Sequence, residues 1–108
     1  MKLNIYEKKQ IVKTYEARTY DLMFGTLEDV AGLLKIDELK SLDDVEIVKF
    51  VTNFVINAMD TTKELMLDIF EDLTEEELRK AKVNEMVDVI VEVIIFTFSR
   101  INKLPRKN

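Results

Sequence analysis

The sequence predicts a mainly α-helical domain of the α+β class, with four to five helices and an N-terminal β-hairpin. Hydrophobic residues make up 47% of the 108 residues and charged residues 34%, which is enough apolar side chain to close one core. The first residues alternate with a period of two, and most later segments repeat with helical spacing. The chain is therefore interpreted as one domain, 1–108, comprising a hairpin (1–18), a helical body (19–103) and a basic tail (104–108).

The alternating segment predicts two strands. Leu3 and Ile5 fall on one side of a short first run, and β-favourable residues return from Ile11 onward. The polar residues EKKQ between the runs can turn the chain, so we expect strands over 2–6 and 11–17. A two-stranded hairpin alone is only marginally stable in water, so this one is expected to pack against helices or to pair its edge with another chain.

Capping residues predict where the first helices begin. Thr26 precedes a helix over about 27–35, and residues 19–25 are left open as an extra turn because Gly25 interrupts the pattern. Ser41 is expected to cap a long helix that runs as far as Met59. Its apolar positions form two neighbouring stripes, Val48, Val51, Val55 and Met59 in one, and Ile47, Phe50, Phe54 and Ala58 in the other.

Two further start signals follow. Asp60 is expected to cap a helix over 61–71, and Thr74 with Glu77 has the spacing of a capping box. The glutamates of EEEL lie about 100° apart on a helix, so they are interpreted as helix-start residues and not as ligands of one metal ion.

The last apolar segment is interpreted as a helix over 85–102, capped by Asn84. Eleven of the seventeen residues from Glu85 to Ile101 are apolar, but Glu85, Asp88, Glu92 and Ser99 fall on one narrow helical stripe. No membrane span is expected, because the longest uncharged run is far shorter than the ~20 apolar residues required. The wide apolar arc implies either deep burial or partial burial with an exposed patch for another chain.

The residues that are missing exclude much chemistry. The chain has no His, no Cys and no Trp, and its two glycines cannot form a phosphate-binding loop. We therefore expect no catalytic residue, no metal site and no cofactor, and we do not expect an enzyme. An enzyme that uses carboxylates alone is the remaining catalytic alternative, and it would need two acids facing each other across a cleft. The first ten residues contain no apolar signal segment, so a cytoplasmic protein is expected.

The charge is distributed in three parts. Residues 1–19 carry five Lys or Arg against two acids, residues 20–79 five against sixteen, and residues 80–108 six against three. The basic ends could meet the acidic middle of neighbouring copies, and a homo-oligomer is expected. Nucleic-acid binding is disfavoured, because the cations near the C-terminus are better explained as complements to a helix end. Those cations are Arg100, Lys103, Arg106 and Lys107.

Three segments carry a family resemblance: TYEARTYDLMFGTLEDVAGLL, DDVEIVKFVTNFVINAMDTTKELMLDIFEDLTEEELRK and NEMVDVIVEVIIFTFSRI. In the order of their features, an apolar helix, an acidic helix start and a Val- and Ile-rich last helix, they resemble the tail assembly chaperones of long-tailed, siphovirus-type phages and prophages of Gram-positive bacteria. The resemblance implies a non-enzymatic protein of the host cytoplasm, absent from the mature virion, whose partners are the tape measure protein and the tail tube protein. It also implies a short product and a longer frameshifted one. The alternative is a small helical regulatory or nucleic-acid-binding phage protein.

A chaperone needs exposed apolar surface that charge protects from self-aggregation. A client helix is expected in a groove between the long helix and the last one. The alternative for each candidate contact is that it packs in the core. The candidate partner-binding residues are Phe50, Phe54, Ile90, Ile94 and Phe98.

Overall fold

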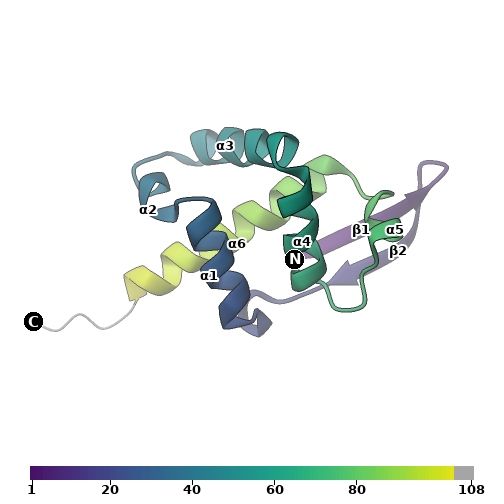
Figure 1. Ribbon diagram of the computed structural model, residues 1–108, viewed down its shortest axis with the longest axis horizontal. Helices are drawn as coiled ribbons and strands as arrows, with labels where there is room; N and C mark the ends of the chain where they lie inside the picture. The colour runs from purple at the N-terminus through teal and green to yellow at the C-terminus, as the bar shows by residue number, and fades with distance from the viewer. Residues whose placement is uncertain (104–108) are drawn as a thin grey trace, which may run out of the picture.

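The computed structural model describes the backbone of residues 1–103 and the side chains of residues 1–99. The expected basic tail, 104–108, and the cation cluster near the C-terminus lie outside the described side chains. Figure 1 shows the last helix along the long axis of the molecule, with the hairpin at one end. The elements in chain order are β1 (Lys2–Glu7), β2 (Gln10–Glu16), a 3-10 turn (Thr19–Asp21), α1 (Phe24–Leu33), α2 (Ile36–Leu39), α3 (Asp44–Asn57), α4 (Met59–Ile69), α5 (Glu75–Leu78) and α6 (Val83–Lys103).

The predicted fold class is confirmed: a helical body follows an antiparallel hairpin. The turn is tighter than expected, because Lys8 and Lys9 alone connect the strands, both with positive φ (50° and 68°). Such angles are typical of the two-residue turns that match strand twist. The register shifts between Ile5 and Tyr6, which leaves Val12 as an extra residue in β2.

Several helix boundaries differ from the prediction, for local reasons. The helix expected at 27 begins at Phe24, so Gly25 lies in its first turn, where a Cβ would meet no atom within 4 Å. The long helix is capped by Asp43, not Ser41, because the Asp43 side chain accepts from the N–H of Glu46, and the Glu46 carboxylate accepts in return from the Asp43 N–H. The last helix begins one residue before its expected cap, Asn84.

The short helix α2 was not predicted, and it brings the number of described helices to six. Lys35 adopts a left-handed conformation (φ 50°, ψ 56°) that ends α1 and redirects the chain. The redirected turn buries Ile36 and Leu39, so tertiary burial supports a helix of only four residues. The capping box of Thr74 and Glu77 is confirmed at the start of α5.

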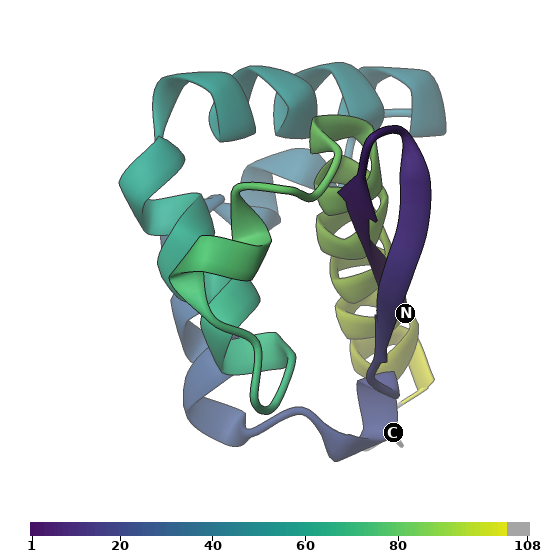
Figure 2. The same cartoon turned by 90° about the vertical axis from the view of Figure 1, so that its right-hand side faces the viewer.

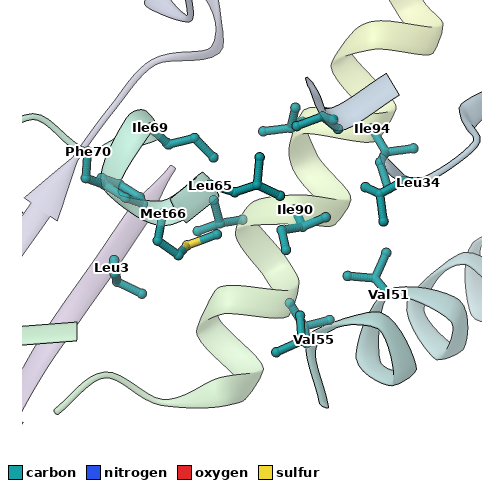
Figure 3. Close-up of a cluster of buried hydrophobic side chains, with 14 of the residues drawn as sticks. Leu3, Leu34, Val51, Val55, Leu65, Met66, Ile69, Phe70, Ile90 and Ile94 are labelled. Atoms are coloured by element: carbon teal, nitrogen blue, oxygen red, sulfur yellow. The ribbon is translucent and has the colours of Figure 1, made fainter. Parts of the chain in front are cut away.

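The core lies around α6. Figure 3 shows Val51 and Val55 of α3 on one side of Ile90, with Leu65 and Met66 of α4 on another. Ile94 lies one turn further along α6, next to Leu34, which follows the last residue of α1. These side chains are almost entirely buried, so α6 is the element on which α1, α3 and α4 converge.

Candidate partner-binding groove

An apolar groove lies where α3, α4, α5 and α6 meet. Ala58 leaves the helical conformation (φ −131°, ψ 57°), so the chain bends between α3 and α4. The bend separates the end of α3 from the start of α6 and leaves a cavity of about 530 Å³. Its apolar lining consists of Val55, Ile56, Met59, Leu78, Ala81, Val83 and Met86.

Three of the lining side chains are exposed to a degree unusual for their type. Ile56 is 53% exposed, Met59 65% and Val83 48%, and they stand on opposite sides of the groove. Burial of apolar side chains stabilises a complex by roughly 25 cal/mol per Å². The groove therefore presents uncovered apolar surface that burial against another molecule would stabilise.

Charged side chains of both signs surround this apolar lining. Glu75 and Glu76 lie in the first turn of α5, where carboxylates complement the positive end of the helix. Lys63 of α4 reaches across to Glu75 at 3.9 Å, and Arg79 follows α5 on the same side. The apolar floor of the groove is thus bordered by both acids and cations.

The α5 wall of the groove is tied to the hairpin through Glu77. Its carboxylate accepts hydrogen bonds from the Tyr15 hydroxyl and from Lys13 Nζ, the latter at 3.1 Å. It also accepts from the Thr74 backbone N–H at 3.2 Å, as part of the capping box. These donors, the Tyr15 hydroxyl first, lower the pKa of Glu77 to about 2.

The α6 wall is tied to the hairpin through Glu85 in the same way. The Glu85 carboxylate accepts from the Tyr6 hydroxyl and from the backbone N–H of Asn4, the latter at 3.0 Å. The hydrogen bond to Glu85 raises the pKa of Tyr6. Lys82 Nζ also lies 4.3 Å from the centre of the Tyr6 ring, which adds a cation–π contact between the hairpin and the residues just before α6. The hairpin therefore contacts two walls of the groove, α5 and the start of α6.

The five residues expected to contact a partner are not gathered on one surface. Ile90 and Ile94 are 1% and 0% exposed, so for them the core alternative holds. Phe54 and Phe98 are half-buried against the core, and Phe50 is more exposed at 36%. None of the five lines the groove.

The groove does lie between the long and the last helix, but at their ends. The expectation that Asp60 caps a helix over 61–71 is wrong: α4 begins at Met59, its cap is Ala58, and Asp60 lies in the first turn. The sequence nevertheless predicts a helix start near this point, and the bend there separates Met59 from the stripe of Val51 and Val55. The predicted stripe continues through Met59, whereas the structure places Met59 beyond the bend. Ile56 and Met59 are the residues that this reasoning missed.

A second apolar patch lies on the other side of the helical body. Tyr20, Met23 and Phe24 are each 72–75% exposed, and the Tyr20 ring meets the Phe96 ring of α6 edge-on at 5.4 Å. This patch is the main competitor of the groove as a contact surface.

Comparison with known proteins identifies no relative: no protein-family model, no curated protein and no solved structure matches the chain. Within residues 1–103, no helix is both long and apolar enough to cross a membrane. In the same described part of the chain, no three acidic side chains come together to form a metal-binding cluster.

Proposed function

We propose that this chain is a non-enzymatic phage tail assembly chaperone. In this role it binds and solubilises the tape measure protein in the host cytoplasm, helps to recruit tail tube subunits, and is absent from the mature virion. The proposal is supported by the resemblance of three sequence segments to that family and by the apolar groove.

The observation that carries the proposal is the exposed apolar lining at the bend between α3 and α4. A tape measure protein is long, hydrophobic and rich in helices, so its segments present apolar stripes that need cover. Met59 and Met86 suit this task, because unbranched, polarisable methionine side chains adapt to differently shaped partners. The strongly acidic middle of the chain opposes aggregation of the chaperone itself.

The alternative, a small regulatory or nucleic-acid-binding protein, has no comparable support among the described side chains. Two cations near the groove are already engaged: Lys80 Nζ bonds to Glu7 at 2.8 Å, and Lys82 lies over the Tyr6 ring. Binding of phosphates would require such cations to face solvent together.

Co-expression with the tape measure protein tests the proposal. We compare the wild-type chain with Met59→Glu in the groove and Met23→Glu in the second apolar patch. Met59 is the first residue of α4, where a carboxylate complements the helix end, so the variant is expected to fold. We expect Met59→Glu to weaken client binding roughly 10- to 100-fold, as loss of a central contact does, and Met23→Glu to leave it unchanged.

The possible results separate the groove from the function. Loss of binding in Met23→Glu alone would move the contact surface to the second patch. Failure of the wild-type chain to keep the tape measure protein in solution would contradict the chaperone function itself. The gene neighbourhood gives a separate test, since the proposal expects a tail tube gene upstream and a very long tape measure gene downstream.

A further inference from the structure

The two outer edges of the hairpin differ in how their backbone groups are satisfied. Met1 and Ala17 exchange two backbone hydrogen bonds, of 2.7 and 2.9 Å. Because paired residues alternate along an antiparallel ladder, the next outward-facing groups on β1 belong to Lys2 and Asn4. The helical body covers this β1 edge.

Two contacts provide that cover. The N–H of Asn4 donates to the Glu85 carboxylate at 3.0 Å, and the N–H of Tyr6 donates to the Lys80 carbonyl at 2.9 Å. Ile5 also forms an isolated antiparallel bridge with Ala81. The residues before α6 thus act as a third, very short strand, and β1 has no free edge over this stretch.

The edge of β2 is different. The same alternation places the backbone groups of Thr14 and Glu16 outward, away from β1. Among the described residues, no hydrogen bond from another segment reaches the N–H or C=O of either one. Figure 2 shows β2 at the outer side of the molecule, with β1 between it and α6.

Side chains do not protect this edge either. Ile11 and Val12 are 54% and 56% exposed, and the bulge at Val12 leaves residues 13–16 as the uninterrupted part of this edge. A lysine in mid-strand often blocks pairing, but Lys13 is turned back onto its own chain, bonded to Glu77 and lying 4.6 Å from the centre of the Tyr15 ring. The edge is therefore open to another strand.

We propose that a second copy of this chain covers the edge, through antiparallel pairing of β2 with β2. The pairing is self-complementary: it directs the cationic tip, Lys8 and Lys9, toward Glu16 of the partner copy in both halves. Glu16 is free to exchange partners, because its bond to Lys2 is a surface pair with both side chains about two-thirds exposed. The product is a four-stranded sheet with Ile11 and Val12 near its centre. This inference does not rest on the proposed function, since β2 contributes no residue to the groove.

Amide hydrogen exchange at rising protein concentration, with sedimentation equilibrium on the same samples, tests the pairing. We expect a dimer to form with concentration, and the amides of Thr14 and Glu16 to become protected as it forms. The amides of Asn4 and Tyr6 are the internal control, because the helical body protects them at every concentration. A chain that stays monomeric at about 1 mM would overturn the inference, as would a dimer in which Thr14 and Glu16 exchange freely.

Charge reversal tests the orientation of the two strands. Lys8→Glu with Lys9→Glu, and separately Glu16→Lys, are each expected to raise the dimer dissociation constant about three- to tenfold. The triple variant restores the attraction and is expected to return within about twofold of the wild type. Lys49→Glu, on the exposed face of α3, makes a matched charge change and should have no effect. A triple variant as weak as the single reversals would contradict antiparallel pairing.

Discussion

The helical body and the hairpin junction are held by different forces. Around α6 the contacts are apolar: Ile90 and Ile94 are almost entirely buried, among Leu34, Val51, Val55 and Leu65. Phe70, at the end of α4, is fully buried next to Met66. At the junction the hairpin also buries Leu3, but its orientation depends on two tyrosine hydroxyls that donate to Glu77 and Glu85.

The two kinds of contact therefore have different roles: apolar burial stabilises the fold, and the hydrogen bonds at the junction orient the hairpin. Apolar burial is proportional to area and has no preferred direction, so it supplies most of the free energy of folding. Hydrogen bonds to carboxylates contribute less net free energy, but they fix geometry and respond to pH. Since Glu77 lies on α5, this wall of the groove inherits the sensitivity to pH.

The largest effect is expected in the body. Phe70→Ala removes a fully buried ring and should lower the free energy of unfolding by about 3–5 kcal/mol. Urea denaturation followed by circular dichroism measures it. The control is Phe24→Ala, whose ring is 75% exposed and whose loss should change stability by less than about 0.5 kcal/mol. Equal effects in the two variants would contradict the assignment of the core.

A smaller effect is expected at the junction, and it depends on pH. The pKa of Glu77 in the folded protein, about 2, is below its ordinary value of 4.5. Its charge therefore stabilises the fold above pH 4.5, and this contribution is lost as the pH falls toward 2. Glu77→Gln should be less stable than the wild type at pH 7, and the difference should shrink between about pH 4.5 and 2. A difference independent of pH would show that the carboxylate charge is not what the junction uses.

Thr62→Val should change stability in the opposite direction. Thr62 is 1% exposed, and its hydroxyl has no hydrogen-bond partner among the described residues. Replacing the hydroxyl by a methyl group of similar size removes a desolvation cost, so the free energy of unfolding should rise by about 1 kcal/mol. Thermal denaturation measures the change, and a loss of stability would mean that the hydroxyl is satisfied in solution.

The smallest effect on stability is expected for Lys80→Gln. Lys80 Nζ lies 2.8 Å from Glu7, but both side chains are about half exposed, and such pairs contribute little. The pKa of Glu7 is a more sensitive measure, because the hydrogen bond to Lys80 lowers it. In the variant, the pKa of Glu7 should return toward its ordinary value, which NMR titration measures. The denaturation midpoint should show no measurable change. A marked shift of the midpoint would make this pair part of the junction's stability.

Local features of the fold could be predicted well. The Thr74–Glu77 capping box, the hairpin and the helical interpretation of the Val- and Ile-rich last segment all follow from residues close together in the chain. Ser41 was the wrong cap, because Asp43 has its own partner, Glu46, three residues later. The reciprocal hydrogen bonds between Asp43 and Glu46 decide the position of the cap.

The candidate site was less predictable. Phe50, Phe54, Ile90, Ile94 and Phe98 are large and apolar, but size and type do not say which side of a wide apolar arc meets another helix. Ile90 faces α3 and α4, Ile94 lies next to Leu34, and both are covered, whereas Ile56 and Met59 flank the bend at Ala58 and remain open. Exposure is a property of the packed arrangement, not of the residue.

The sequence by itself therefore determined what depends on near neighbours: the helix starts, the strand alternation, the wide apolar surfaces and the excess of acids in the middle of the chain. Only the tertiary structure decided which apolar residues stay exposed, which hairpin edge is covered, and which carboxylates receive the tyrosine hydroxyls. The physical reason is that capping and periodicity act over a few residues, whereas burial and tertiary hydrogen bonds join groups far apart in the chain, such as the Asn4 N–H and the Glu85 carboxylate, which are 81 positions apart.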